Sequence, residues 1–260
     1  MEWYLYIAVI GVGLLTGFIN TLAAGGSLLS LPFLIFLGLP ANVANGTNRI
    51  AILLQNIVSV GSFKQQRILN PKEGIWIAVP AIIGSLIGAQ IAINFDEEVM
   101  RKTIGGLLLV MFFIIMIKPD KWIKGQEGEM KSRPSVFQII IFFFIGIYGG
   151  FIQAGVGFFL LAGLVLGAGA DLIKANALKV FIILLYTPFA LFIFILHHQV
   201  DYKLGLILAV GNMAGAYLGA KYGVRWGIGF VRYVLLAAIF FSAAKLIGVI
   251  EYIGILMFMA

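Results

Sequence analysis

Two stretches of this chain combine small, polar and basic residues in a pattern that could bind an anion. The first runs from Gly17 to Arg49 and breaks an apolar run with glycines, Pro32 and uncharged polar side chains; the second, from 148 to 179, repeats it in altered form. Glycines let a ligand approach the backbone, and free N–H groups at helix starts attract negative charge. The candidate substrate-binding residues are Asn20, Gly25, Gly26, Ser27, Asn45, Thr47, Asn48 and Arg49 in the first stretch and Gln153, Gly155, Gly157, Asn176 and Lys179 in the second.

Each of these features also has a purely structural explanation. A glycine break between two apolar runs can be a tight hairpin turn. Arg49 and Lys179 can be basic residues at helix ends that reach the membrane surface and set the topology. Asn45 and Asn176 can cap the starts of their helices, a role compatible with ligand contact. The sequence leaves these alternatives open.

Other polar or small residues have simpler assignments. Glycines spaced four residues apart recur at 84–88 and 211–219, the spacing of close helix contacts, and we expect helix-packing faces there. His197 and His198 lie at the expected outer end of a span, where an interfacial position is expected.

The composition is that of an integral membrane protein. The 260 residues are 62% hydrophobic and 11% charged, against about 45–50% and 25% in soluble domains. Their mean hydropathy is +1.06, and apolar runs repeatedly reach the length that crosses a bilayer. The basic residues behind the net charge of +7 lie in short loops, which argues against a nucleic-acid-binding face. With no cysteine and two histidines, neither a metal site nor a cofactor is expected.

Ten apolar segments are expected, five on each side of a polar linker. They lie near 4–22, 27–38, 44–63, 74–94 and 100–117, and near 136–153, 157–169, 174–196, 204–221 and 229–249. The second segment of each half is too short for an ordinary span and follows a glycine break. The predicted fold is therefore an all-α polytopic membrane protein with 8–10 spans, depending on whether the short segments cross or re-enter.

The two halves are predicted to be copies of one repeat. The shift that places Gly26 on Gly157 aligns 26–101 with 157–232 without a gap, and glycine, asparagine, lysine and arginine are among the identical positions. Because each half has an odd number of segments, the second half enters the membrane from the opposite side. The predicted organisation is transmembrane repeat 1 at 1–117, a cytoplasmic linker at 118–134 and an inverted repeat 2 at 135–260.

Charge gives both the expected orientation and the expected ligand class. Alternating sides place thirteen of the 18 Lys and Arg on one face, which the positive-inside rule makes cytoplasmic, so both termini are expected outside. None of the eleven carboxylates lies well inside an apolar span. Proton and cation relays commonly use such carboxylates, so an anion is the favoured substrate. An inside-negative potential drives an anion outward.

The two motifs also resemble those of a known family. GFINTLAAGGSLLSLPFLIFLGLPANVANGTNR at 17–49, with YGGFIQAGVG at 148–157, is similar to the TauE/SafE sulfite exporter family of bacterial and archaeal permeases, and the likeness covers nearly the whole chain. The resemblance implies a multi-pass protein of the cell (inner) membrane that moves sulfite, a sulfonate or a related anion. The chain departs from the family at Ala24 and Gln153, where members often have glycine, and at Ala41, where they often have proline.

Residues and resemblance together predict a secondary transporter that exports a small sulfur-containing anion by alternating access at the repeat interface. An anion channel or facilitator without alternating access is the alternative. An enzyme is disfavoured because no intramembrane nucleophile with a base, and no metal cluster, is visible. A purely structural subunit would not need paired polar breaks. The expected partners are the anion and the lipid bilayer, with a homo-oligomer left open.

Overall fold

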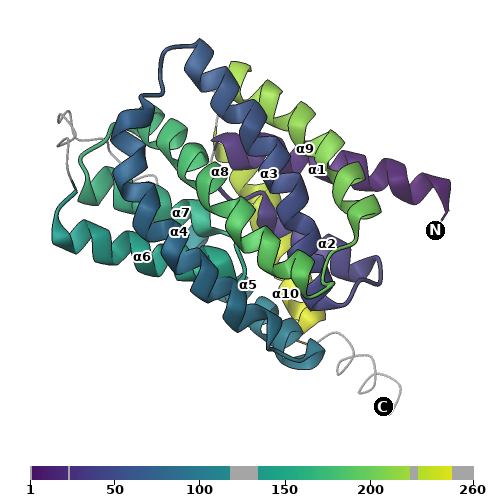
Figure 1. Cartoon of the computed structure of the whole chain (residues 1–260). Helices are drawn as coiled ribbons and strands as arrows, with labels where there is room; N and C mark the ends of the chain where they lie inside the picture. Colours follow the sequence, from purple (N-terminus) through teal and green to yellow (C-terminus); the bar gives the residue numbers. More distant parts are fainter. Residues whose placement is uncertain (1, 23, 118–133, 223–227, 248–260) are drawn as a thin grey trace.

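The computed structural model of this chain describes residues 2–22, 24–117, 134–222 and 228–247, without the side chains of 222 and 228–234. Every regular element in these residues is a helix (Figure 1). The first half contains α1 (Trp3–Leu22), α2 (Ser27–Phe36), α3 (Ala41–Gln65), α4 (Pro71–Ile93) and α5 (Glu97–Met116). The second half contains α6 (Val136–Phe151), α7 (Val156–Ala162), the π-helix η2 (Gly163–Gly167), α8 (Leu172–Leu196), α9 (Tyr202–Tyr222) and α10 (Ile228–Leu246).

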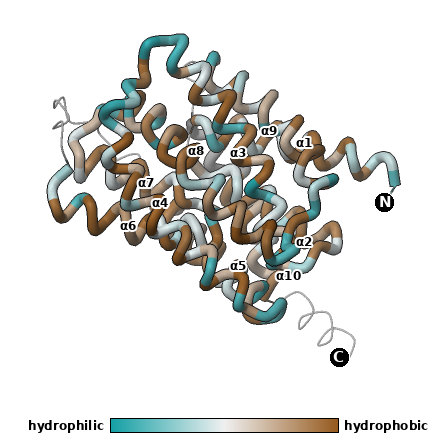
Figure 2. Tube along the Cα trace, in the orientation of Figure 1, coloured by the Kyte–Doolittle hydropathy of each residue, from teal (hydrophilic) through white to brown (hydrophobic). Residues whose placement is uncertain are grey.

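Five of the described helices, α1, α4, α5, α8 and α9, are long and apolar enough to cross a membrane. Hydrophobic residues make up most of the helices, and hydrophilic residues gather in the loops that join them (Figure 2). This confirms the predicted all-helical membrane fold. The expected segments fall within a few residues of the observed helices, except that most of the linker, 118–133, lies outside the described residues.

The helix boundaries agree with the alignment of the two halves of the sequence. The alignment that places Gly26 on Gly157 also superimposes both ends of α3 on both ends of α8, and the start of α4 on the start of α9. The packing partners are exchanged between the halves: α1 packs on α9 as α6 packs on α4, and α3 packs on α9 as α8 packs on α4. This is the pattern expected of two copies related by a two-fold axis. The inverted orientation of the halves, their division into domains and the placement of the termini stay predictions.

Glycines allow the outer helices to pack with their backbones in contact. A Cβ atom added at Gly88 on α4 would overlap the carbonyl oxygen of Ile147 on α6, and one added at Gly215 on α9 would overlap that of Leu14 on α1. The predicted helix-packing role of the glycines in 84–88 and 211–219 is thus confirmed. These two tight pairs flank α3 and α8, which contact each other in the middle of the bundle (Figure 1).

The central helix α3 carries its polar residues on the side that faces other helices. Asn45, Asn48, Gln55, Asn56 and Ser59 are all buried, and the 3.6-residue period of the helix places them along one face. In lipid, polar groups must be satisfied within the protein, so this face has to find its partners on neighbouring helices. It thereby builds a polar interior inside an apolar bundle.

Candidate functional site

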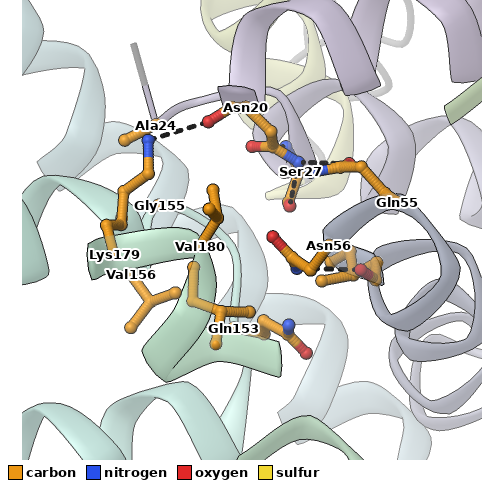
Figure 3. Close-up of a pocket in the computed structure, with 13 residues that line it drawn as sticks. Asn20, Ala24, Ser27, Gln55, Asn56, Gln153, Gly155, Val156, Lys179 and Val180 are labelled. Carbon is orange, nitrogen blue, oxygen red and sulfur yellow. Dashed lines mark hydrogen bonds between the residues drawn. The ribbon is translucent and has the colours of Figure 1, made fainter. Parts of the chain in front are cut away.

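The two breaks between paired helices meet at one small pocket. One break separates α1 from α2 and the other separates α6 from α7, and residues of both line the pocket together with α3 and α8 (Figure 3). The pocket encloses about 20 Å³, room for about one water molecule. Its lining consists of Asn20, Ala24, Ser27, Ile52, Gln55, Asn56, Gln153, Gly155, Val156, Gly157, Lys179, Val180 and Ile183.

Left-handed backbone turns the chain at both breaks. Ala24 has φ 87°, Gln153 has φ 66° and Gly155 has φ 76°. This conformation costs a residue with a Cβ atom about 1–2 kcal/mol, so Ala24 and Gln153 are held in it by their surroundings. The turns place Ser27, the first residue of α2, and Val156, the first residue of α7, at the pocket wall.

A cluster of amides ties the first break to α3 and α9. The Asn20 Nδ2 donates to Ser27 Oγ and to Gln55 Oε1, both at 3.2 Å, and the Ser27 backbone N–H donates to Asn20 Oδ1 at 3.3 Å. From α9, Asn212 Nδ2 donates to the same Gln55 oxygen at 3.1 Å. Both bonds to Gln55 are accepted by its oxygen, which leaves its Nε2 as a donor on a residue that lines the pocket.

Lys179 on α8 is the one cation among the residues that line the pocket. Its side chain is 1% exposed, and its Nζ donates to the Asn20 carbonyl oxygen at 2.8 Å and to Asn176 Oδ1 at 2.7 Å. Asn176 Nδ2 in turn donates to the Leu22 carbonyl oxygen at 3.2 Å. The last carbonyls of α1, which carry the negative end of the helix dipole, therefore hold the ammonium at the pocket.

Arg49 on α3 plays the equivalent part at the second break but lies outside the pocket. Its guanidinium is fully buried and donates to the carbonyl oxygens of Gly149 at 3.0 Å and Gly150 at 2.6 Å, and to Gln153 Oε1 at 3.1 Å. Asn45 Nδ2 donates to the next carbonyl oxygen, that of Phe151, at 2.7 Å. The carbonyl end of α6 is therefore held by the side chains of Arg49 and Asn45.

Each half of the chain caps the carbonyl end of a helix in the other half, so the caps are reciprocal. Helix α3 of the first half binds the end of α6, and α8 of the second half binds the end of α1. The interpretation of Arg49 and Lys179 as helix-end residues that reach the membrane surface is wrong, because both are enclosed. The interpretation of Asn45 and Asn176 as helix N-caps is also wrong, since the N-cap positions are at 40 and 171.

Some of the remaining predicted substrate-binding residues make contacts between helices, and others line the pocket. Thr47 accepts the backbone N–H of Asp201 at 2.8 Å, and Asn48 accepts the hydroxyl of Ser30 at 2.7 Å, so both serve contacts between helices. Six of the thirteen predicted residues line the pocket: Asn20, Ser27, Gln153, Gly155, Gly157 and Lys179. Seven do not, namely Gly25, Gly26, Asn45, Thr47, Asn48, Arg49 and Asn176.

Gly25 and Gly26 contact protein atoms. A Cβ atom at Gly26 would overlap the Thr16 carbonyl oxygen, and one at Gly25 would crowd Leu235 and Phe158. Close packing around the α1–α2 turn therefore accounts for both glycines.

Sequence reasoning missed two polar residues of the wall, Gln55 and Asn56. Both continue the helical stripe that begins at Asn45, since residues three, four, seven and eleven positions apart share one face of a helix. The intervening apolar run, 50–54, conceals this stripe when the chain is read as a span. Continuing the helical period of Asn45 and Asn48 through this apolar run leads to Gln55 and Asn56.

The pocket is chemically suited to an anion. Its polar groups include the Lys179 ammonium, the Gln55 amide nitrogen and the Ser27 hydroxyl, and no carboxylate is among the described residues that line it. Charge-assisted hydrogen bonds are stronger than neutral ones, and a low-dielectric surrounding increases their strength further. A small anion would receive donors from both halves of the chain.

The two breaks touch at Ala24 and Gly157, and this contact predicts a sensitive position. A Cβ atom at Gly157 would lie 2.5 Å from the Ala24 Cβ, so Gly157→Ala forces the starts of α2 and α7 apart. Overpacking of this kind costs about 1–3 kcal/mol, and we expect the transport rate in proteoliposomes to fall about tenfold.

Gly167→Ala is the matched control, because a Cβ atom there meets no atom within 4 Å and the residue belongs to the same broken helix. Equal rates for the two variants would show that the contact between the breaks has no part in transport.

Comparison with known proteins identifies a family and several relatives. The model of the family "Sulfite exporter TauE/SafE" matches residues 9–246. A "Probable membrane transporter protein ORF9" of Sinorhizobium sp. is 26% identical over 90% of this chain and 89% of the relative. A "Probable membrane transporter protein" of Haemophilus influenzae is 26% identical over 91% and 92%, and YfcA of Escherichia coli, with the same description, is 26% identical over 91% and 87%. No solved structure matches the chain significantly.

Proposed function

Because this chain belongs to the TauE/SafE sulfite exporter family, we propose that it is a secondary transporter that moves a small sulfur-containing anion, such as sulfite or a sulfonate, across the cell membrane. Its relatives are described as probable membrane transporters, without a named substrate. The choice of an anion rests on this chain's own residues.

The observation that carries the proposal is the pocket where the two helix breaks meet. Broken helices near the middle of a transporter commonly form its substrate site. Here the pocket offers Lys179 and several uncharged donors, and its lining contains no carboxylate. The carboxylates of the described residues belong to helix starts and loops, as Glu73, Asp96, Glu97 and Asp171 illustrate. A cation would meet the like charge of Lys179 and no carboxylate among the described residues of the lining.

Alternating access suits the arrangement better than an open channel. Both halves contribute to the pocket wall, α3 from the first and α8 from the second, so relative movement of the halves changes the site directly. Room for about one water molecule is less than sulfite requires, which favours a closed state that must widen to admit substrate. Export is the proposed direction, since an inside-negative potential drives anions outward by about 2.3 kcal/mol per charge per 100 mV.

The test is the current that purified protein generates in proteoliposomes after rapid addition of a single solute, with no other ion gradient. We expect sulfite or sulfoacetate to produce a saturable current of anionic sign, and a monovalent cation to produce none. Protein-free liposomes made from the same lipid provide the control.

Two outcomes would contradict the proposal. A response to the cation with silence toward every anion would reject an anion site. A large conductance that rises with concentration without saturating would replace the transporter by an anion channel, in which both gates open together.

A further inference from the structure

We infer that the anion taken by this pocket also carries a hydrogen-bond donor, which it gives to the side-chain oxygen of Asn56. The inference rests on the proposed anion site and narrows its substrate class from any small anion to one with a hydroxyl, amino or acidic hydrogen. Asn56 becomes a specificity-determining residue.

The starting observation is an acceptor without a partner. Asn56 lines the pocket, its side chain is 1% exposed, and its Oδ1 has no hydrogen bond within the described part of the chain. Of the buried side-chain atoms left unpaired there, this one belongs to a pocket-lining residue. Buried polar atoms are nearly always paired in native proteins, so an unpaired atom at a binding site indicates a ligand group.

The hydrogen bond made by the amide nitrogen of Asn56 fixes the orientation of the amide group. Its Nδ2 donates to the Ile52 carbonyl oxygen, one turn earlier on α3, at 2.8 Å. A carbonyl oxygen can only accept, so exchanging the amide's nitrogen and oxygen would bring two acceptors together. The oxygen must therefore be the free atom. Figure 3 shows it turned toward the pocket, on the side opposite the bond to Ile52.

The equivalent residue in the second half has an acceptor oxygen that is hydrogen-bonded. Thr187, which the alignment of the halves places on Asn56, makes the same backward bond, from its Oγ1 to the Ile183 carbonyl oxygen at 2.6 Å. There the hydroxyl oxygen also accepts from Gln153 Nε2 at 3.4 Å. No described residue supplies the matching donor to Asn56, and of these two positions only Asn56 lines the pocket.

The described surroundings of Asn56 do not supply the missing hydrogen: Ser27 and Gln55 also line the pocket, but no hydrogen bond joins either of them to the Asn56 oxygen. Ile52 on α3 and Val180 and Ile183 on α8 are its apolar companions in the pocket lining. Lys179, the charged end of the site, already donates to Asn20 and Asn176. An anion held by Lys179 and bearing a donor would satisfy both ends of the pocket, whereas an anion without one would leave a buried acceptor unpaired.

The test compares two sulfonates of nearly equal size, 2-hydroxyethanesulfonate and propane-1-sulfonate, which exchange a hydroxyl for a methyl group. Each is measured by saturable current in proteoliposomes of the full chain. We expect the wild type to prefer the hydroxyl compound by about tenfold in apparent affinity, the cost of one unpaired buried acceptor. Asn56→Leu, which is similar in volume and apolar, should reduce that preference to about onefold.

Two further variants protect the test against misfolding and altered shape. Asn56→Ala also removes the acceptor and should lose the preference if the leucine variant cannot be purified. Ile183→Val changes the same wall without changing its hydrogen bonding, so it should alter both affinities and keep their ratio. Sulfite added at acidic and at alkaline pH separates a protonated inorganic anion from an organic one, since only the former loses its donor as the pH rises.

Each result bears on the inference separately from the proposed function. Saturable anion currents with equal affinity for the two sulfonates would leave the transporter standing and overturn the inference, because an ordered water molecule would then satisfy Asn56. A preference unchanged in both Asn56 variants would also overturn it. Absence of any anion current would reject both proposals.

Discussion

Replacing Lys179 by methionine is expected to lower the apparent affinity for the transported anion at least about 30-fold. Methionine keeps much of the length of the side chain and removes the one positive charge that lines the pocket. Removing one member of a buried, hydrogen-bonded charge pair costs about 2–5 kcal/mol, which corresponds to about 30-fold to several-thousand-fold in affinity. The measurement is the concentration dependence of the current in proteoliposomes.

Lys174→Met is the control for this prediction. Lys174 lies near the start of α8 and pairs with Glu73 at 2.7 Å, with its side chain 29% exposed. Because it lies outside the pocket lining, its replacement should leave the affinity unchanged. Lys179→Arg, which keeps the charge, should retain part of the activity. An unchanged affinity in Lys179→Met, measured on protein that elutes as a single species, would remove this residue from the site.

Replacing Arg49 by methionine is expected to act on stability and to leave the affinity of the surviving folded protein nearly unchanged. The guanidinium holds the carbonyl oxygens of Gly149 and Gly150 and the side chain of Gln153, and its central carbon also lies 4.6 Å from the centre of the Phe194 ring. Its removal leaves several buried acceptors unpaired at once. We expect a loss of about 3–5 kcal/mol in the free energy of unfolding.

Unfolding in mixed micelles, followed by circular dichroism, measures that loss. Arg101→Met is the matched control, because Arg101 is exposed near the start of α5 and makes no equivalent set of contacts among the described residues. A stability equal to that of the wild type, together with a weakened anion affinity, would reverse the roles assigned here to Arg49 and Lys179.

These opposite expectations come from contacts that the sequence could not provide. Arg49 and Lys179 have the same expected role in the sequence, since the alignment of the halves places Lys179 on Asn48, the residue before Arg49. Their partners lie 100 to 159 residues away, in the other half of the chain. Which of two equivalent side chains reaches a pocket depends on small differences in helix packing, and local spacing carries no information about them.

Local patterns, in contrast, predicted the helices well. Apolar runs bounded by glycine, proline and charged residues are direct consequences of the cost of leaving backbone groups unpaired in lipid. The boundaries of α3 and α8 could therefore be predicted from the sequence, and so could the packing role of Gly88 and Gly215. The pocket forms where five helices meet, α1, α2, α3, α7 and α8, and six of the thirteen candidate residues line it.

Two departures from the family's pattern acquire a physical meaning in the structure. Ala24 and Gln153, at positions where members of the family often have glycine, both have left-handed backbone. Glycine adopts that conformation without strain, so its frequent use at these positions follows from the turns themselves. In this chain Gln153 has a compensating role, since its side chain accepts from Arg49 and donates to Thr187.

The reciprocal caps also determine the order in which the protein can be completed during its synthesis. A ribosome releases Arg49 100 residues before Gly149, so α3 enters the bilayer with a guanidinium whose acceptors do not yet exist. The carbonyl end of α1 lacks its ammonium partner for a longer stretch of synthesis, because Lys179 is made 159 residues after Asn20. The first half therefore lacks these partners for its buried polar groups until α6 and α8 have been synthesised.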